Sequence, residues 1–595
     1  MTEGKIYEDL STVLARANAV FRVVAVLIFL ALSYYWKVQI LEFKEYWALA
    51  ESNRTRTRVL PAPRGLIRDR NGVILADNRA SFKVSLVREN IVDAERSYAA
   101  VAGLLAIDEG MIRERVERFR SLPAFEPIVI KDGLSTLDVA PIESRRLEFP
   151  ELVVEAEPQR FYPHGPLAAH ALGYLQERTP EEAAALRGGR LGVGQMVGRT
   201  GVEREYDELL TGQDGSVVEI VDSLGRTHGE TGRRDPVQGQ DVAISLDVRL
   251  QTRAEELLEG REGVIIALDP RSGEVLAMAS FPTFDLNRFI TRFTPSEWLE
   301  LVNDPLSPLE NRALRGLYPP GSIFKLVMAL GGFDFGYVNE RTTVFCSGST
   351  VIYGQPFACW FQPGHGSMDL VDAIKNSCNI YFYQLGRRMG IDMIALAGER
   401  AGLGGRTGID LAGEKDGLVP SSQWKMRTLK TPWFPGETIS VSIGQGQLQT
   451  TPLQIAAMTA LIARRGVRVR PHLLKGASAD AREERAPFKA SSFGPVVEGM
   501  WRSVNDMGTG RGAFVSGLDV CGKTGSTQVM SRERAEKLAK AGIEIKTHSW
   551  FSGFAPRDDP RIVVTVLVER GGGGGETAAP LAGRIFSLFA EVRDR

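Results

Sequence analysis

Residues 263–279 read GVIIALDPRSGEVLAMA, and this stretch gives the clearest indication of the fold. Two apolar runs, 263–268 and 275–279, flank the segment DPRSG, whose Asp, Pro, Ser and Gly are the residue types of tight turns. Short apolar runs bounded by turn residues are typical of buried strands. The stretch therefore predicts a β-hairpin.

Further strands are predicted on both sides of this hairpin. Residues 241–246 (DVAISL) have a strand-like pattern and precede a helix over 247–258, and three more strands follow late in the chain, at 518–525, 550–554 and 561–568. Helices dominate the part between. Strands from both ends of a region with a helical middle indicate one sheet covered by helices, which is an α+β layer fold.

The N-terminal region contains a segment of a different kind. Residues 17–36 (ANAVFRVVAVLIFLALSYYW) are almost wholly apolar, carry Arg22 as their one charge and end in three aromatic residues. Twenty helical residues span about 30 Å, the thickness of a bilayer core, and aromatic residues are enriched at its surface. No small-residue cleavage site follows, so we expect an uncleaved anchor; a buried core helix is the alternative.

The part between the anchor and residue 240 is predicted to be a mixed α+β region of short elements. A charged, helical stalk is expected over 41–58 and helical structure over 93–120. Residues 66–78 (LIRDRNGVILADN) place Asn71-Gly72 between two apolar stretches, which is a strong signal for a hairpin.

The composition excludes several classes of protein. The 595 residues are 43% hydrophobic and 24% charged, as is usual for folded proteins. The formal net charge of −1 argues against a protein that binds nucleic acid through bulk basicity. Four cysteines are too few for a disulfide scaffold. The run 571–575 consists of glycine alone and is expected to be a flexible loop.

A serine and a lysine three residues apart form the first chemical motif, Ser322-Ile323-Phe324-Lys325. Residues 319–321 (PPG) end the preceding chain, so a helix is expected to begin near Ser322 and to place Lys325 on the same face. The positive potential of a helix N-terminus disfavours a protonated lysine and lowers its pKa toward the range of a general base. Alone, such a short motif is as readily a serine and a lysine on an exposed helix.

Two more short motifs follow. Ser377-Cys378-Asn379 comes after a helical stretch over 370–376, and Lys523-Thr524-Gly525 lies at the end of the strand predicted from residue 518. A glycine in a strand lets a ligand approach the sheet edge closely. Each motif alone is compatible with a solvated loop. In this order and on these elements, the three motifs together resemble the signature of the penicillin-binding proteins.

The resemblance to class B penicillin-binding proteins extends over nearly the whole chain. The Gly444-Gln445-Gly446 context and the glycine-rich loop resemble the cell-elongation branch of that family, and the division-specific branch is the alternative. The segments that match the family pattern, besides the three motifs, are 63–72, 198–203 (GRTGVE), 267–284, 311–312, 444–453, 548–551 and 569–573.

The resemblance also implies a fold and a domain order. The order is a cytoplasmic tail (1–16), one transmembrane helix (17–36), a non-catalytic, dimerisation-like α+β pedestal (37–240) and a transpeptidase domain (241–595). The last has the penicillin-binding transpeptidase fold, an antiparallel sheet covered by helices. The substrate of the family lies outside the inner membrane, so the pedestal and the catalytic domain are expected in the periplasm. The charges that flank the anchor are weak evidence for either orientation.

The resemblance assigns roles to five catalytic residues of a peptidoglycan D,D-transpeptidase. Ser322 would attack the carbonyl between the two terminal D-alanines of a stem peptide, and Lys325 would accept its proton. Ser377 would pass a proton to the leaving D-alanine. Asn379 would hold Lys325 and the substrate amide, and Lys523 would supply positive potential.

Substrate binding is assigned to the strand that follows Lys523. Thr524 would bind the terminal carboxylate, and the strand through Gly525 would pair with the substrate backbone. The backbone N–H groups of Ser322 and Ser526 would form the oxyanion hole, in which one donor typically contributes about 3–4 kcal/mol. An amine of a neighbouring peptide would resolve the acyl-enzyme, and β-lactams would acylate the same serine. No organic cofactor is implied.

The resemblance further implies partners. The anchor and the pedestal would dock a SEDS-family glycosyltransferase and scaffold proteins of the rod complex. The ligands would be peptidoglycan stem peptides and β-lactams, and no nucleic acid is expected.

Three of the four cysteines fall in one short stretch and could hold a metal. Cys346, Cys359 and Cys378, with His365 among them, lie within 33 residues, and thiolates with an imidazole suit tetrahedral Zn²⁺. The resemblance supports this hypothesis, because some elongation-type relatives hold zinc through residues that resemble His365 and Cys378. A disulfide in an oxidising periplasm and three buried cysteines are the alternatives.

Other functions share the three motifs. A serine β-lactamase would hydrolyse its acyl-enzyme, and a β-lactam sensor would signal. The anchored region before residue 240 argues against a plain β-lactamase, and 16 residues leave no room for a cytoplasmic signalling domain. A non-catalytic scaffold that activates a glycan polymerase is the third alternative.

Overall fold

The chain forms two compact units in the computed structural model, which describes residues 10–179, 182, 196–222, 227–291, 293–477, 483–528 and 546–593. The N-terminal unit consists of Met1–Pro63, Ser81–Glu157 and Gln213–Gln238. The C-terminal unit consists of Arg64–Ala80, Pro158–Gly212 and Gly239–Arg595. Two segments that precede residue 240 in the chain therefore fold with the C-terminal unit.

The N-terminal unit begins with one long apolar helix. Helix α1 (Leu10–Trp36) continues into a π-helical turn (Lys37–Leu41). Together, Leu10–Leu41 are long and apolar enough to cross a membrane. No side chain of α1 is buried in the structure. The helix fits the single-pass anchor that the sequence predicts.

The predicted helical stalk over 41–58 is wrong in its last part. Helix α2 (Phe43–Arg54) ends before strand β1 (Thr55–Leu60), which pairs antiparallel with β8 (Gly215–Val221); β8 pairs in turn with β9 (Thr227–Arg234). The sequence TRTRVL alternates β-branched residues, which favour strands. A partner strand more than 150 residues away decides the structure of this segment.

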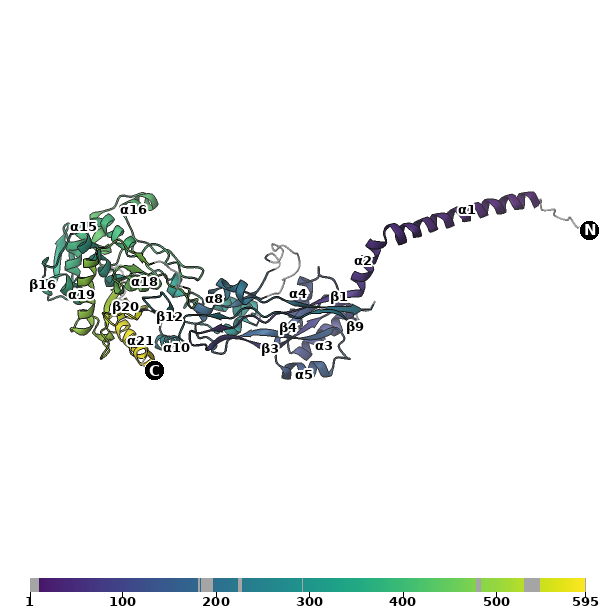
Figure 1. The fold of residues 1–595 in the computed structure, drawn as a ribbon, viewed down its shortest axis with the longest axis horizontal. Helices are drawn as coiled ribbons and strands as arrows, with labels where there is room; N and C mark the ends of the chain where they lie inside the picture. Colours follow the sequence, from purple (N-terminus) through teal and green to yellow (C-terminus); the bar gives the residue numbers. More distant parts are fainter. Residues whose placement is uncertain are drawn as a thin grey trace, which may run out of the picture. The chain divides into compact units, whose positions relative to one another are not determined.

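A second sheet carries the hydrophobic core of the N-terminal unit (Figure 1). Strand β3 pairs with both β4 and β5, and helices α3, α4 and α5 contribute to the same core. The helical stretch predicted over 93–120 is two helices, because Ala106 adopts a left-handed conformation, with φ 50°, between them. The bounds are β3 (Ile74–Leu86), α3 (Ala94–Leu105), α4 (Glu109–Arg118), β4 (Ile128–Leu134), α5 (Thr136–Ser144) and β5 (Leu152–Phe161).

The C-terminal unit is built on one antiparallel sheet in the order β12-β11-β21-β20-β19. The predicted hairpin is β11 (Gly263–Leu268) and β12 (Val275–Phe281), and the predicted late strands are β19 (Cys521–Thr527), β20 (His548–Ala555) and β21 (Ile562–Val568). Early and late segments of the chain therefore share this sheet. The predicted α+β fold is confirmed.

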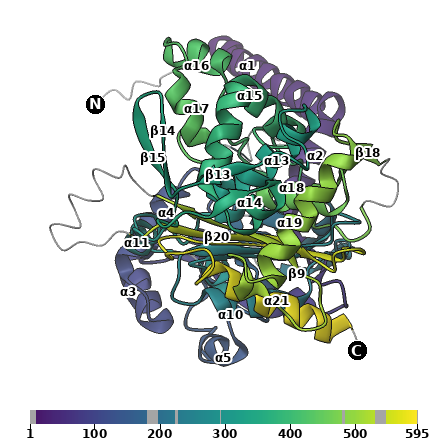
Figure 2. The same cartoon turned by 90° about the vertical axis from the view of Figure 1, so that its left-hand side faces the viewer.

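Both faces of this sheet are covered. Successive residues of β11 alternate between two cores: Ile266 lies in the core with helices α13, α15 and α18, and Ile265 in the core with α10 and α21. Figure 2 shows the first group of helices above the sheet and α10 and α21 below it. Both isoleucines are fully buried, and each such side chain contributes roughly 1.5–3 kcal/mol of transfer free energy.

The helices of the C-terminal unit that follow residue 247 have these bounds: α10 (Val248–Leu258), α11 (Pro295–Val302), α12 (Arg312–Arg315), α13 (Lys325–Asp334), α14 (Leu370–Lys375), α15 (Asn379–Arg400), α16 (Ser422–Leu429), α17 (Pro435–Val441), α18 (Pro452–Ala463), α19 (Phe493–Asn505) and α21 (Ala578–Arg593). Three two-stranded ribbons accompany them: β13 (Val344–Cys346) with β16 (Gly366–Met368), β14 (Ser349–Ile352) with β15 (Gln355–Ala358), and β17 (Val467–Arg468) with β18 (Glu484–Arg485).

The segments before residue 240 add short elements to this unit. The hairpin predicted at 66–78 is present, since β2 (Ile67–Arg68) pairs with β3 around a turn in which Gly72 has φ 89°. The other elements before residue 240 are α6 (Ala169–Leu172), β6 (Leu175–Glu177), β7 (Met196–Gly198), α8 (Gly201–Glu205) and α9 (Asp207–Leu210). After residue 240, β10 (Val242–Ala243) pairs parallel with β2.

Candidate active site

The first motif forms the start of a helix, as the sequence predicts. A 3₁₀ turn, Gly321–Phe324, leads directly into α13, so Ser322 and Lys325 lie one turn apart on the same face. The backbone N–H of Gly321 donates to the Gly444 carbonyl at 2.9 Å. Gly444 has φ 78°, and a Cβ there would lie 1.9 Å from the Gly321 carbonyl oxygen. The 444–446 motif therefore supports the serine turn through its backbone.

Lys325 joins the first motif to the second. Its ammonium group donates to the Ser377 carbonyl at 2.8 Å, to the Ser377 hydroxyl at 3.2 Å and to Asn379 Oδ1 at 2.7 Å. The side chain is fully buried. Burial lowers the pKa of Lys325 to about 8, although the thiols of Cys378 and Cys359 act in the opposite direction. A lysine with such a pKa can serve as a base near neutral pH.

Ser377 has an unusual backbone that aims its carbonyl at Lys325. It lies between α14 and α15 with φ 53°, in the left-handed region that residues with a side chain rarely adopt. Residues held in this way concentrate at functional sites. Asn379 is the first residue of α15, so the second motif is a tight connection between two helices.

The third motif lies on the edge strand β19. Lys523 is fully buried and donates to the Thr524 carbonyl at 2.9 Å. Burial, and then the nearby Lys325, hold the pKa of Lys523 well below its usual value. Thr524 is buried and its hydroxyl donates to Thr509 Oγ1 at 2.9 Å. Since β19 ends the order of the sheet, its outer edge can accept an added strand.

The glycine run beside β19 is not a flexible loop, contrary to the prediction from composition. The N–H of Gly574 donates to Ser526 Oγ at 3.1 Å, and the carbonyl of Gly573 accepts from Ser549 Oγ at 3.1 Å. A Cβ on Gly574 would lie 2.4 Å from the Gly525 carbonyl oxygen. Glycine is required here because two backbones approach each other closely.

The structure thus brings together residues of all three predicted motifs. Strand β19 packs against the Ser322 turn, and Lys325 bonds to the second motif. Ser322 is partly exposed between the buried Gly321 and Ile323. Among the residues that the structure describes, its hydroxyl makes no hydrogen bond within the protein.

Comparison with known proteins agrees with this geometry. Residues 263–587 match the family described as the penicillin-binding protein transpeptidase domain, and residues 59–244 match the penicillin-binding protein dimerisation domain. The chain belongs to the penicillin-binding protein transpeptidase family. The family membership predicted from the sequence is confirmed.

Several named penicillin-binding proteins and their complexes are similar to this chain over most of its length. The peptidoglycan D,D-transpeptidase MrdA of Acinetobacter baumannii is 36% identical over 590 residues, which are 97% of this chain and 87% of that protein. The complex between penicillin-binding protein 2 (PBP2) and MreC from Helicobacter pylori contains a chain with 27% identity and a TM-score of 0.78, with 90% of this chain and 99% of that chain covered. A chain of a peptidoglycan synthase complex is 32% identical with a TM-score of 0.72, covering 96% and 98%.

Next to the active site, this penicillin-binding protein brings Cys346, Cys359, His365 and Cys378 into one cluster. Their four ligand atoms lie within 4.8 Å of one another, and all three cysteines are buried free thiols. His365 Nδ1 is 3.5 Å from the sulfurs of Cys346 and Cys359. The hydrogen bond with the Cys378 thiol lowers the pKa of the Cys359 thiol, and burial does not outweigh this effect. Cys378 lies between Ser377 and Asn379, so the cluster and the second motif share one segment.

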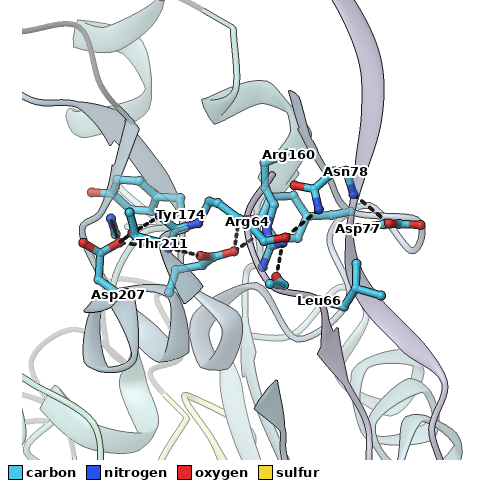
Figure 3. A network of polar contacts seen from close by, with 12 residues as sticks. Arg64, Leu66, Asp77, Asn78, Arg160, Tyr174, Asp207 and Thr211 are labelled. Carbon is cyan, nitrogen blue, oxygen red and sulfur yellow. Dashed lines mark hydrogen bonds and ion pairs between the residues drawn. The ribbon is translucent and has the colours of Figure 1, made fainter. Parts of the chain in front are cut away.

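Two other sequence segments of the family pattern meet in a buried ion-pair network (Figure 3). Arg64 donates to Glu203 at 2.9 Å and to Asp207 at 2.8 Å, and Arg160 donates to Glu203 at 2.7 Å. Glu203 is fully buried. Burial alone would raise the pKa of its carboxyl, but Arg160 and Arg64 outweigh this and lower that pKa. The segments 63–72 and 198–203 are thus partners of each other.

The sequence assigns no role to the residues that bond to the chain segment just before Ser322. The Trp550 indole donates to the Pro319 carbonyl at 3.1 Å, and the Tyr318 hydroxyl donates to Glu569 at 2.7 Å. Trp550 and Glu569 belong to segments that resemble the family pattern, and this was their only signal in the sequence.

Proposed function

We propose that this penicillin-binding protein is the peptidoglycan D,D-transpeptidase of cell elongation, with Ser322 as its nucleophile. The observation that carries the proposal is a fully buried Lys325, three residues after Ser322, held by Ser377 and Asn379 beside the edge strand β19. Relatives named MrdA and PBP2 over most of the chain favour the elongation branch.

The first half of the reaction forms an acyl-enzyme. Neutral Lys325 accepts the Ser322 proton, and Ser322 Oγ attacks the carbonyl of the penultimate D-alanine of a stem peptide. The backbone N–H groups of Ser322 and Ser526 stabilise the oxyanion. The peptide bond to the terminal D-alanine breaks, and Ser377 passes a proton to the leaving amine. Lys325 can be neutral because burial lowers its pKa to about 8.

The second half transfers the acyl group. The amine of a neighbouring stem peptide attacks the ester, which forms the crosslink and releases Ser322. Asn379 holds Lys325 and the substrate amide, and Lys523 with Thr524 provides positive potential and a hydroxyl for the terminal carboxylate. The backbone of β19 at Gly525 pairs with the peptide as an added strand. A β-lactam acylates Ser322 in the same way, and no organic cofactor takes part.

Labelling with a fluorescent penicillin tests this proposal. We expect the full-length protein in detergent to be labelled stably, and labelling to be lost in Ser322→Ala and Lys325→Ala. Ser296→Ala, at an exposed serine of α11, is the matched control and should label normally. Label that decays within seconds would indicate a β-lactam hydrolase, and unlabelled folded wild type would favour a non-catalytic scaffold.

We also propose that Cys346, Cys359, His365 and Cys378 bind Zn²⁺. The fit rests on geometry: tetrahedral zinc with Zn–S bonds near 2.3 Å needs ligand atoms about 3.5–3.8 Å apart. The distances from His365 Nδ1 to the sulfurs of Cys346 and Cys359, 3.5 Å each, agree with this requirement. Bound zinc would have a structural role and would fix Cys378, and thereby the connection that contains Ser377 and Asn379.

Metal analysis of the purified protein tests the zinc proposal directly. We expect about one zinc per wild-type chain and a loss in His365→Ala. His228→Ala, at an exposed histidine outside the cluster, is the control and should retain the metal. Protein purified under reducing conditions without stoichiometric zinc would contradict the proposal.

The location and partners follow from the same function. We propose that the apolar helix anchors the chain in the inner membrane, with residues 1–16 in the cytoplasm and the pedestal and catalytic domain in the periplasm. We propose that the pedestal and anchor dock a rod-complex scaffold protein and a SEDS-family glycosyltransferase, as the family resemblance implies. A solved complex of a relative with MreC and a solved peptidoglycan synthase complex support a scaffold partner and a synthase partner. Protease added to spheroplasts should digest the chain beyond the anchor; full protection would contradict this orientation.

A further inference from the structure

A single carboxylate at the end of the central sheet connects the two sides of the active site. Glu569 directly follows β21, and its side chain is 15% exposed. Oε1 accepts from the Tyr318 hydroxyl at 2.7 Å and from Arg312 Nε at 3.0 Å. Its backbone N–H donates to the Glu262 carbonyl at 2.8 Å, so the sheet fixes the carboxylate in place.

On one side, the carboxylate is bonded to the start of the chain segment that leads to the nucleophile. Tyr318 exchanges two backbone hydrogen bonds with Thr450, each 2.9 Å long, and its ring packs edge-on against Trp550 at 6.2 Å. Two prolines, at 319 and 320, then lead to Gly321 and Ser322. Since proline fixes φ, a displacement of Tyr318 passes along this segment to the serine.

On the other side, the chain beyond Glu569 controls the strand with the second oxyanion donor. Arg570 has φ 53°, and its backbone N–H donates to His548 Nδ1 at 3.2 Å. The glycine run follows and reaches Ser526 through the 3.1 Å hydrogen bond from Gly574. Only four residues lie between Glu569 and Gly574, which makes this contact with β19.

We infer that Glu569 is a positioning residue that sets the Ser322 backbone N–H against the Ser526 backbone N–H. The inference rests on the proposed function, in which these two groups form the oxyanion hole. Donors act only when they lie at hydrogen-bond distance from the developing oxyanion, and removal of one costs about 10²- to 10³-fold in rate. A displacement of the two N–H groups relative to each other should therefore lower the rate by part of that factor.

The contact with Tyr318 carries this role, and the contact with Arg312 does not. Arg312 also donates to the carbonyls of Ser307 at 3.1 Å and Leu306 at 2.6 Å, so it keeps partners when Glu569 is replaced. Among the described residues, the Tyr318 hydroxyl has Glu569 as its one hydrogen-bond partner.

The test separates binding from acylation in full-length protein with a fluorescent penicillin. Stopped-flow rates over a range of penicillin concentrations give the dissociation constant of the first complex and the limiting acylation rate constant. In Glu569→Ala and in Tyr318→Phe we expect the limiting rate constant to fall by about 10-fold, a fraction of the loss of one donor, with the dissociation constant changed less than threefold. The double variant should be no slower than either single variant.

Conservative and control variants distinguish this role from general destabilisation. Glu569→Gln keeps an oxygen that accepts from Tyr318 and should restore the rate to within about threefold of wild type. Glu310→Gln removes a carboxylate that lies eight residues before Tyr318 in the chain, where it pairs with Arg315, and should change neither constant.

An unchanged acylation rate in Tyr318→Phe, or losses that multiply in the double variant, would overturn the inference. If Glu569→Ala does not fold, the acylation rate of Tyr318→Phe alone still tests the inference. Failure of the proposed function looks different, because wild type would then not be acylated or Ser322→Ala would still be labelled.

Discussion

Two buried clusters of charged residues in the C-terminal unit differ in whether their charges are paired. In the cluster around Glu203, the guanidinium groups of Arg64 and Arg160 face a carboxylate at 2.7–2.9 Å, and the charges compensate one another. In the active site, Lys325 and Lys523 bond only to carbonyl, hydroxyl and amide oxygens; no carboxylate of the described residues pairs with either. Both clusters are buried, so burial alone does not distinguish them.

The difference lies in which protonation state the surroundings favour. An ion pair favours charged partners and gives a fixed cross-link between segments, whereas neutral acceptors leave the cost of burying an ammonium group uncompensated. The pKa of Lys325 accordingly falls to about 8, while Arg160 and Arg64 lower the pKa of Glu203. In this protein, a buried cation without a carboxylate partner therefore lies at the site of the chemistry. A buried cation that is paired with a carboxylate instead connects segments of the fold.

The largest expected effect comes from breaking the compensated cluster. Glu203→Gln leaves Arg160 without its carboxylate in a buried position, and loss of one partner of a buried pair costs about 3–5 kcal/mol of unfolding free energy. Urea unfolding of the full-length protein measures this. The exposed pair of Arg253 with Glu256 supplies the control, since Glu256→Gln should cost less than about 0.5 kcal/mol. Equal losses in the two variants would contradict the comparison.

The second prediction gives the buried lysine of the active site a carboxylate partner. Asn379→Asp places a carboxylate where Oδ1 now accepts from Lys325 at 2.7 Å, and a neighbouring opposite charge raises a lysine pKa by about 1–3 units. Wild-type acylation by penicillin should rise with pH, with an inflection near pH 8 and a plateau above it, because the neutral amine is the base.

In Asn379→Asp the inflection should move to higher pH, and the rate at pH 7 should fall about 10- to 1000-fold, since less of the lysine is neutral there. Asn303→Asp, at an exposed asparagine after α11, should leave the profile unchanged. An inflection at the wild-type pH in Asn379→Asp would refute the role of Lys325 as the base.

The third and smallest effect concerns the backbone that presents oxygens to Lys325. Ser377→Gly and Ser377→Ala both remove the hydroxyl, but only alanine retains a Cβ at φ 53°. The glycine variant should be more stable by about 1 kcal/mol, the cost of the left-handed conformation. At Ser587, in the interior of α21, the order should reverse, because glycine is unfavourable within a helix. Thermal unfolding of the four variants measures both differences, and the same order at both positions would exclude strain at Ser377.

The sequence was most informative where local pattern and final environment agree. Residues 562–568 (IVVTVLV) are wholly apolar apart from Thr565 and become a strand buried on both faces, as such runs do. The turn chemistry of 269–273 was sufficient to locate the β11–β12 hairpin. The three motifs were recognisable because each is compact in sequence; the roles of their residues stay predictions.

Long-range partners and backbone geometry could not be predicted in this way. Arg64 meets Glu203 across 139 residues, and Tyr318 meets Glu569 across 251 residues, and no local periodicity encodes either pair. The left-handed backbone of Ser377 has no sequence signal, since serine rarely adopts it. The glycine run was misjudged because its composition is that of a flexible linker, whereas its lack of side chains permits close contact with β19.

The alternation of the chain between its two units has a practical consequence for protein production. The path changes unit after Pro63, Ala80, Glu157, Gly212 and Gln238, so no single cut in the gene yields a complete C-terminal unit. An expressed fragment that starts at residue 241 omits Arg64, Arg160 and Glu203 together, and with them the network that joins the first two segments of that unit. A soluble version suited to inhibitor screening therefore has to start upstream of Arg64 and retain the pedestal, with the anchor helix as the part to remove.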